Sequence, residues 1–213
     1  MIRIEDLTVT RNGQTVLHDI TLGFGQGGIT ALIGPNGAGK STLLHALSGL
    51  LPASRGRGEV EGRDIARITP LERARLVALL MQTDQVTARL TVEDLVSFGR
   101  WPYHKGRPGR RDTEMVAEAL AQFDLRDLAD RQIDTLSGGQ RQRAFVAMAW
   151  AQDTPWLLLD EPLAALDPRH VRDLMERLHA MSRPGPGQRS ILIVMHDLAA
   201  TARYADRIVA LKD

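Results

Sequence analysis

The chain has 213 residues, 43% of them hydrophobic, which is enough for one substantial core or for a core with a satellite subdomain. Its 27 Lys and Arg residues against 26 Asp and Glu leave a net charge of +1, whereas nucleic-acid-binding proteins usually carry a strong basic excess. The lack of cysteine excludes disulfides and thiolate metal sites, and no uncharged apolar run approaches the roughly 18 residues that span a membrane.

The N-terminal part of the sequence predicts strands around one helix. Partial alternation over 3–9 and the turn signal Asn12-Gly13 predict a β-hairpin. The apolar run 29–33 predicts a short strand that leads into a glycine-rich loop. The next segment, 40–50, predicts a helix, and the turn-rich stretch 54–62 predicts a second hairpin.

Helical signals dominate the middle of the chain. Thr69 and Thr91 each have the sequence features of a helix N-cap. We expect residues 86–150 to form a mostly helical block, with a loop over 99–111. Apolar side chains recur on one helix face of this block at Val116, Leu120 and Phe123.

Strands and helices alternate again in the last third of the chain. Apolar runs at 156–160, 190–195 and 207–211 predict strands, and Asp167 is the expected N-cap of a helix that follows the first of them. Such alternation predicts an α/β fold with a parallel sheet and helices on both faces.

The most specific motif is the loop after residue 33, which fits the pattern G-x-x-x-x-G-K-[ST]. Backbone N–H groups and a helix N-terminus cradle nucleotide phosphates in such a loop. We expect Lys40 to reach the β- and γ-phosphates of ATP, Ser41 to bind Mg²⁺ and Thr42 to bond the α-phosphate. The residues of the motif are Gly34, Pro35, Asn36, Gly37, Ala38, Gly39, Lys40, Ser41 and Thr42.

Carboxylates and a histidine follow two other predicted strands. Asp160 and Glu161 lie at the carboxyl end of a strand, where open α/β sheets bind their ligands. Asp160 fits a partner of Mg²⁺ through water, and Glu161 fits the base that orients and polarises the attacking water. His196 ends the next strand and is the expected γ-phosphate contact. Without the phosphate loop, the two carboxylates could be an ordinary solvated strand edge.

Another phosphate-binding segment is expected at residues 137–140. Ser137 and Gln140 fit a capping box, and Gly138 and Gly139 leave the helix N–H groups accessible. Because the segment lies on a separate helical block, it is better placed to close on the nucleotide of another copy of the chain. Gln82 is a weak signal by itself, since Gln is common where loops begin.

One basic and aromatic cluster falls in the predicted loop. Such a cluster can bind single-stranded nucleic acid, but the balanced charge favours a solvated or partner-facing loop. Its members are Arg100, Trp101, Tyr103, Lys105, Arg107, Arg110 and Arg111.

The order of these motifs resembles that of the nucleotide-binding subunits of ABC transporters along essentially the whole chain. The set comprises the phosphate loop, the Q-loop residue Gln82, a signature at 136–140, a Walker B strand at 157–161, a D-loop at 164–167 and the switch residue His196. The resemblance implies a P-loop NTPase core with a parallel sheet, an N-terminal antiparallel β subdomain and an inserted helical subdomain.

It also implies boundaries within the chain. Residues 1–85 and 151–213 would form the catalytic core with the β subdomain, and 86–150 the helical subdomain that carries the signature. Relatives continue for a few more strands and a regulatory tail, so the C-terminal part of the family's domain would be absent after Asp213.

The family's partners and ligands follow from the same resemblance. Two subunits would form a head-to-tail homodimer, with each Mg²⁺-bound ATP between the phosphate loop of one subunit and Ser137, Gly138, Gly139 and Gln140 of the other. Asp167 would also lie at this nucleotide. The dimer would lie at the cytoplasmic face of the inner membrane as a peripheral unit and would drive an integral membrane permease. A periplasmic or surface substrate-binding protein would be an indirect partner, and no nucleic acid would be bound.

Two residues have further implied roles. Gln82 would sense Mg²⁺ and the attacking water while touching the permease. Arg11 occupies the position where the family usually has an aromatic residue, and its guanidinium plane could stack on adenine.

A narrower resemblance concerns the transported substrate. The segment 99–104 resembles the G-R-x-P-[HY] segment of iron-chelate importer ATPases, and 106–108 and 144–152 are similar to the same group. This implies ferric-siderophore import, with vitamin B12 or haem as neighbouring cargoes. The alternatives are a non-transport ABC ATPase acting on ribosomes or DNA and a non-hydrolysing ATP-binding regulator, and the catalytic set argues against the latter.

Overall fold

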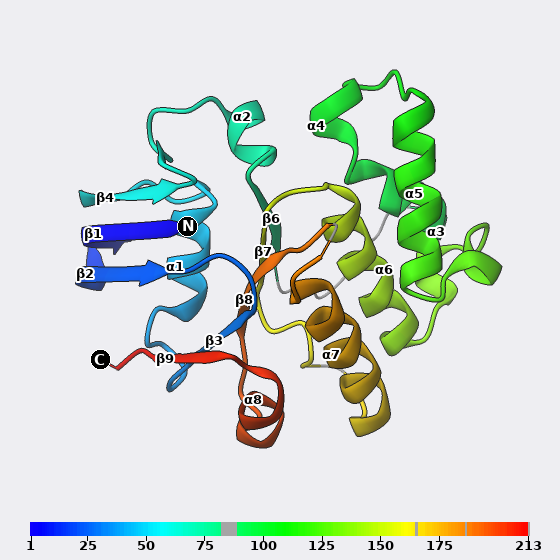
Figure 1. The fold of residues 1–213 in the computed structure, drawn as a ribbon. Helices are drawn as coiled ribbons and strands as arrows, with labels where there is room; N and C mark the ends of the chain where they lie inside the picture. Colours follow the sequence, from blue (N-terminus) through cyan, green and yellow to red (C-terminus); the bar gives the residue numbers. More distant parts are fainter. Residues whose placement is uncertain (82–88, 165, 186, 213) are drawn as a thin grey trace.

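The computed structural model describes residues 1–81, 89–164, 166–185 and 187–212 (Figure 1). In this part of the chain, an antiparallel sheet has the strand order β2-β1-β4-β5, and a parallel sheet has the order β6-β7-β8-β3-β9. The antiparallel strands are β1 (Ile2–Arg11), β2 (Gln14–Phe24), β4 (Arg55–Val60) and β5 (Arg63–Asp64). The parallel strands are β3 (Ile29–Ile33), β6 (Val77–Leu80), β7 (Trp156–Leu159), β8 (Ser190–Val194) and β9 (Arg207–Ala210).

The helices fall into a group around the sheets and a group in the middle of the sequence. The first group contains α1 (Lys40–Leu47), α2 (Pro70–Ala74), α7 (Pro168–Ser182) and α8 (Leu198–Tyr204). The second contains α3 (Val92–Phe98), α4 (Trp101–His104), α5 (Arg110–Gln122) and α6 (Gly138–Ala151), with short 3₁₀ turns η1 (Arg126–Leu128) and η2 (Ile133–Thr135). Helices α3, α5 and α6 pack against one another at the right of Figure 1.

Side chains of the parallel sheet alternate between two hydrophobic cores, because successive residues of a strand point to opposite faces. Leu32, Leu158 and Leu192 pack with α1 and the antiparallel sheet. Leu157 and Ile191 pack on the other face, with α6 and α7. Helix α1 is therefore held between the two sheets, and the predicted parallel sheet with helices on both faces is confirmed.

Several local predictions are confirmed by the backbone. Asn12 and Gly13 turn the first hairpin with φ values of 50° and 79°. Thr69 and Thr91 each accept a hydrogen bond from the N–H three residues later, and both capping boxes are complete. The predicted helix over 40–50 was too long, since α1 ends at Leu47 and Gly49 turns the chain with φ of 70°.

The prediction of a solvated or partner-facing loop over 99–111 was wrong for part of this segment, which contains α4 and the start of α5. Arg100 is 3% exposed. Its Nε donates to Oδ1 of Asp112 over 3.0 Å, its Nη1 donates to the Ala151 carbonyl over 2.9 Å, and its guanidinium lies 4.0 Å from the centre of the Tyr103 ring. A buried charge requires such partners, so the segment folds inward around Arg100.

The same segment also contacts the core. Arg75, which follows α2, donates Nε and Nη2 to the Pro102 carbonyl over 3.3 and 3.1 Å. We call Arg75, Arg100, Tyr103 and Asp112 the Arg100 cluster. A Cβ added at Gly99 would lie 2.2 Å from the Met148 carbonyl, so glycine is needed there for α3 and α6 to approach. The Arg100 cluster therefore joins α4, the start of α5 and the end of α6 to the segment after α2.

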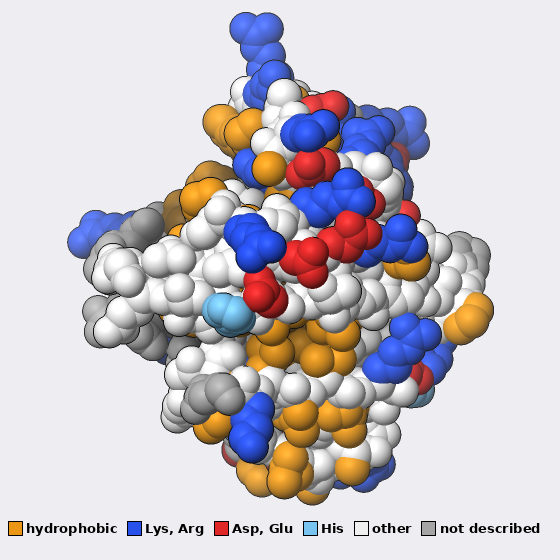
Figure 2. All heavy atoms as spheres, turned by 90° about the vertical axis from the view of Figure 1, so that its left-hand side faces the viewer, with side chains coloured by type: hydrophobic (Ala, Val, Ile, Leu, Met, Phe, Trp, Pro, Cys, Tyr) orange, Lys and Arg blue, Asp and Glu red, His pale blue; other side chains and the backbone are white. Residues whose placement is uncertain are grey.

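Charged side chains of both signs lie next to one another on the side of the molecule that carries the antiparallel sheet (Figure 2). Within that sheet, Arg57 pairs with Glu5 at 2.7 Å and Arg55 with Asp19 at 3.8 Å. Exposed pairs contribute about 0–1 kcal/mol each, so the stability of the sheet comes mainly from its buried apolar face. None of the helices in the described ranges has the length and apolar character required to cross a membrane.

Candidate active site

The glycine-rich loop lies at the carboxyl end of β3 and leads directly into α1. Gly39 is the N-cap of α1 in a left-handed conformation, with φ of 86°, and no side chain caps this helix. The first N–H groups of a helix have no partner within it, so those of α1 are available to an anion. The strand, loop and helix thus have the arrangement that the phosphate-binding pattern requires.

Lys40 holds its positive charge against the inside of the loop. The side chain is buried, and Nζ donates to the carbonyls of Gly34 and Pro35 over 2.9 and 2.8 Å. Two carbonyl acceptors stabilise the ammonium group, because a buried charge without partners would be costly. The cation is therefore already in the loop, where the sequence predicts the phosphates.

Ser41 and Asp160 bring α1 and the end of β7 together. The hydroxyl of Ser41 donates to Oδ1 of Asp160 over 2.9 Å, and Asp160 is 5% exposed. Burial raises the pKa of Asp160, although the hydrogen bond from Ser41 acts in the opposite direction. A buried carboxylate beside a hydroxyl provides oxygen ligands of the kind that Mg²⁺ prefers.

Glu161 and His196 meet at the ends of two paired strands, β7 and β8. Nε2 of His196 lies 2.8 Å from Oε1 of Glu161. Glu161 has φ of 49°, in the left-handed region that residues other than glycine seldom adopt. Such backbone conformations are concentrated at functional sites, where surrounding structure maintains them.

A cavity of about 350 Å³ joins several of the predicted residues. Lys40 and Glu161 lie on its lining, so the loop and the carboxylate after Asp160 face the same space. Arg11, which is exposed at the end of β1, is also there. The lining consists of Arg11, Val16, Asn36, Gly37, Gly39, Lys40, Ser41, Thr42 and Glu161.

Another cavity, of about 320 Å³, also has Glu161 on its lining, together with His196, Ala164 and Leu166 among others. The predicted loop residues Gly34, Pro35 and Ala38 are outside both linings but belong to the same turn. Glu161 is therefore shared between the space beside the loop and the space beside the predicted D-loop.

Residues 137–140 form the predicted capping box at the start of α6. Oγ of Ser137 accepts from the N–H of Gln140 over 3.3 Å, and Oε1 of Gln140 accepts from the N–H of Ser137 over 3.0 Å. None of the four residues, Gly138 and Gly139 included, is part of the lining of the cavity beside the phosphate loop. The structure therefore does not bring this segment to the loop of its own chain.

Asp167 is the N-cap of α7, as predicted, and accepts from the N–H of His170 over 3.0 Å. Its other oxygen lies 2.7 Å from Nδ1 of His170. The backbone and side-chain hydrogen bonds with His170 lower the pKa of Asp167. Sequence reasoning missed His170, although its place three residues after an N-cap indicates a capping interaction.

Sequence reasoning also missed His45, whose Nε2 lies 3.9 Å from Oδ2 of Asp160. His45 follows Ser41 by four residues on α1, and this spacing places both side chains on one helix face.

The predicted Q-loop residue, Gln82, lies outside the described residues.

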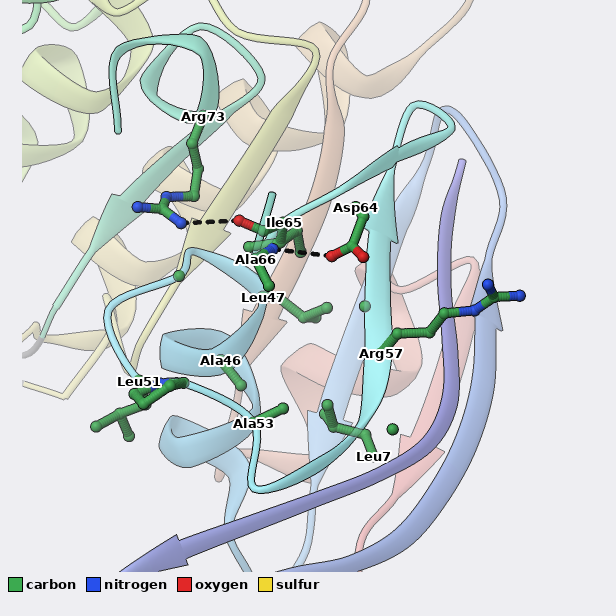
Figure 3. A pocket seen from close by; sticks show the side chains of 14 residues that line it. Leu7, Ala46, Leu47, Leu51, Ala53, Arg57, Asp64, Ile65, Ala66 and Arg73 are labelled. Atoms are coloured by element: carbon green, nitrogen blue, oxygen red, sulfur yellow. Dashed lines mark hydrogen bonds between the residues drawn. The ribbon is translucent and has the colours of Figure 1, made fainter. Parts of the chain in front are cut away.

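A cavity of about 300 Å³ lies elsewhere, between the end of α1 and the β4–β5 hairpin (Figure 3). It contains none of the predicted site residues. Its polar groups are already paired, since Asp64 accepts from the N–H of Ala66 over 2.9 Å and Arg73 donates to the Ile65 carbonyl over 2.9 Å. The chemistry predicted from the sequence lies at the edge of the parallel sheet instead.

A glycine-rich loop between a parallel strand and a helix, beside carboxylates at the end of another strand, defines a P-loop nucleotide-binding protein. Residues 17–164 match the family model described as ABC transporter. The chain therefore belongs to the ABC transporter family and is an ABC-type ATPase, as its motif order predicted.

Similar proteins extend this result along the whole chain. The petrobactin import ATP-binding protein of Bacillus subtilis (strain 168) is 41% identical over 213 residues, covering 100% of this chain and 84% of that protein. A hemin import ATP-binding protein of Pseudomonas aeruginosa is 41% identical over 218 residues, with 100% and 84% covered. A bacterial ABC transporter cassette with a dimeric structure superposes with a TM-score of 0.87 at 25% identity, with 100% and 94% covered.

Proposed function

We propose that this chain is the ATP-hydrolysing subunit of an importer that takes up an iron chelate through a separate membrane permease. The observation that carries the proposal is the meeting of Ser41 and Asp160, and of Glu161 and His196, at one edge of the parallel sheet, beside the loop that holds Lys40. Whole-length similarity to petrobactin and hemin import proteins supports import and an iron-chelate cargo, and favours transport over an action on ribosomes or DNA.

The loop from Gly34 to Thr42 binds the phosphates of ATP in this proposal. Its backbone N–H groups and the uncapped start of α1 supply donors, and Lys40 exchanges its two carbonyl partners for the β- and γ-phosphates. Thr42 bonds the α-phosphate. Arg11, on the cavity lining, stacks its guanidinium plane on adenine.

Mg²⁺ fits the pair formed by Ser41 and Asp160. The raised pKa of Asp160 shows that burial disfavours its charged form, which a nearby cation would stabilise. Ser41 and Asp160 provide only some of the oxygen ligands that Mg²⁺ takes, so phosphate oxygens of the nucleotide would supply others. Ser41, Asp160 and Gln82 would hold Mg²⁺, which would supply positive charge beside the phosphates.

Glu161 acts as the base that orients and polarises the attacking water. His196 contacts the γ-phosphate, and its 2.8 Å contact with Glu161 holds the carboxylate at the edge of the sheet. A positioned general base contributes about 10²–10⁴-fold to such a reaction. Its role therefore predicts a large loss of turnover with little loss of nucleotide binding when the carboxylate is neutralised.

Hydrolysis requires two subunits in a head-to-tail dimer. Ser137, Gly138, Gly139 and Gln140 lie apart from the phosphate cavity of their own chain, which supports their action on the nucleotide of the partner. Asp167 acts at the same partner site, and the dimeric cassette with the same fold supports this assembly. We propose that residues 86–150 form the helical subdomain that presents the signature, and that 1–85 and 151–213 form the catalytic core with the β subdomain.

The membrane partner is an integral permease of the inner membrane, and this chain binds it at the cytoplasmic face. Gln82 links the nucleotide to this permease, and a substrate-binding protein outside the membrane delivers the cargo. The chain is then a peripheral subunit, and dimer closure drives the permease between its two access states.

Reconstitution with candidate permeases in lipid vesicles tests the proposal. We expect a ferric siderophore, delivered by its binding protein, to stimulate ATP hydrolysis, with a Glu161→Gln complex as the inactive control. If haem or vitamin B12 stimulates hydrolysis and ferric siderophores do not, the cargo is haem or vitamin B12 instead. If neither the permease nor any ferric chelate changes the rate of ATP hydrolysis by the subunit, the import proposal is overturned.

A further inference from the structure

His170 connects the predicted D-loop to the start of the signature helix. Its Nδ1 lies 2.7 Å from Oδ2 of Asp167, while its ring lies against the α-carbon of Gly139. A Cβ added at Gly139 would lie 3.1 Å from Cγ and Cδ2 of the ring. One side chain on the first turn of α7 therefore touches two segments that the proposed function assigns to the nucleotide of the partner.

Helix capping alone does not account for this arrangement. An aspartate N-cap needs only the backbone N–H of the residue three positions later, which any residue except proline provides, and His170 supplies that bond over 3.0 Å. The contact of Nδ1 with Asp167 and the packing of the ring on Gly139 are not needed for this capping bond. Because the carboxylate of Asp167 accepts, Nδ1 carries the proton in this contact.

We propose that His170 is a positioning residue for the nucleotide bound by the partner subunit. It fixes the distance between Asp167 and the N-terminus of α6, so that the D-loop and the signature approach the partner as one unit. This inference rests on the proposed head-to-tail dimer. It predicts that damage at His170 lowers turnover without changing how the same subunit binds ATP through its own loop.

Three substitutions separate the two contacts of the side chain. Asn places an amide N–H near the position of Nδ1 and keeps the bond to Asp167, Phe keeps a ring against Gly139, and Ala keeps neither. We expect His170→Ala to lower kcat about tenfold or more, the scale of a lost hydrogen bond to a charged group, with an unchanged KM for ATP. His170→Asn should recover part of that loss, which a general folding defect would not allow, and melting curves identify any variant that fails to fold.

Mixing of variant subunits tests the action on the partner. Lys40→Met damages the loop of its own chain, so a mixed dimer of Lys40→Met with His170→Ala has both defects at one nucleotide and none at the other. We expect hydrolysis to return when these two inactive or weakly active proteins are mixed. A mixture of Lys40→Met with Ser137→Ala is the matched control, because it tests the shared nucleotide without His170.

The outcomes distinguish this inference from the proposed function. Recovery in the control mixture without recovery in the His170 mixture would show that His170 acts within its own subunit, and would overturn the inference alone. A control mixture that stays inactive would overturn the head-to-tail site, and the inference with it. An unchanged kcat for His170→Ala would remove the positioning role directly.

Discussion

Nε2 of His196 lies 2.8 Å from Oε1 of Glu161, across 35 positions of sequence, because β7 and β8 pair in parallel and end at the same edge of the sheet. The contact places the proposed base and the proposed γ-phosphate contact in one hydrogen-bonded pair. Replacement of Glu161 therefore removes the proposed base, whereas replacement of His196 removes the proposed contact with the γ-phosphate.

Glu161→Gln keeps the size of the side chain but removes the base. We expect turnover to fall by about 10²–10⁴-fold, with ATP retained and a stable dimer formed, because binding does not require the carboxylate. Size-exclusion chromatography with ATP and phosphate release measure the two effects. A Glu161→Gln protein that hydrolyses ATP like the parent would show that the base lies elsewhere.

Lys40→Met should weaken ATP binding, since methionine fills a similar volume without the ammonium group. The lost charged hydrogen bonds predict a Kd about 10–100-fold higher. Lys105→Met is the matched control, because Lys105 is exposed beside α4 and away from the phosphate loop. Titration with a fluorescent ATP analogue measures the Kd of both variants and of the parent. A Lys40→Met protein that binds the analogue as tightly as the parent would contradict the proposed role of Lys40.

Asp160→Asn should raise the melting temperature while it removes the response to Mg²⁺. Burial raises the pKa of Asp160, so its ionised form destabilises the folded state at neutral pH, and the amide removes that cost while still accepting from Ser41. We expect a rise of a few degrees, on the scale of about 1 kcal/mol. In the parent, Mg²⁺ added with a non-hydrolysable ATP analogue should raise the melting temperature further. A similar Mg²⁺ response in Asp160→Asn would argue against this metal site.

Asp206 provides a test of stability against pH. Hydrogen bonds from Arg183 lower its pKa to about 2, and the N–H of Ile29 also donates to it over 2.7 Å. A depressed carboxyl pKa stabilises the folded state above the unfolded value of 3.8, and this stability is lost as the pH falls from 3.8 towards 2. Because Arg183 and Asp206 are each 37% exposed, screening reduces the effect to about 1 kcal/mol.

The matching experiment compares Asp206→Asn with the parent by urea unfolding. We expect the variant to be less stable at pH 7, with the difference shrinking as the pH approaches 2. A difference that does not depend on pH would mean that packing, and not the charge, is responsible.

The Arg100 cluster should contribute strongly to stability. Arg100→Ala leaves the carboxylate of Asp112, which is 13% exposed, without its partner, and such losses cost about 3–5 kcal/mol. Trp101→Ala is the control on the same helix, because Trp101 is 54% exposed and should change stability by less than about 0.5 kcal/mol. The double variant Arg100→Ala/Asp112→Ala should lose less than the sum of the single variants. Strict additivity would show that the pair does not interact.

Local signals explain what could be predicted from the sequence. The glycine pattern, the N-caps at Thr91 and Asp167 and the turn at Asn12 each act within a few residues, and each is found where expected. The apolar runs likewise predicted the central strands. Motif order was sufficient for the family because it combines several independent short patterns.

The burial of Arg100 and the contact of His170 with Gly139 could not be predicted, because they depend on residues far away in the sequence. Arg100 bonds to Asp112 and Ala151, which are 12 and 51 positions away, so its burial follows from how the helices pack. The contact of His170 with Gly139 joins two helix starts that meet only in the folded protein. Long-range packing decides whether a basic residue is a surface charge or an internal one.

The strand order brings together residues that are made at different times during synthesis of the chain. Lys40 and Ser41 leave the ribosome early, whereas Glu161 and His196 leave it much later, and β3 and β7 are joined only through β8, which lies between them. Such non-local pairings form late in folding. A nascent chain that has completed its glycine-rich loop therefore still lacks the proposed base and the proposed γ-phosphate contact.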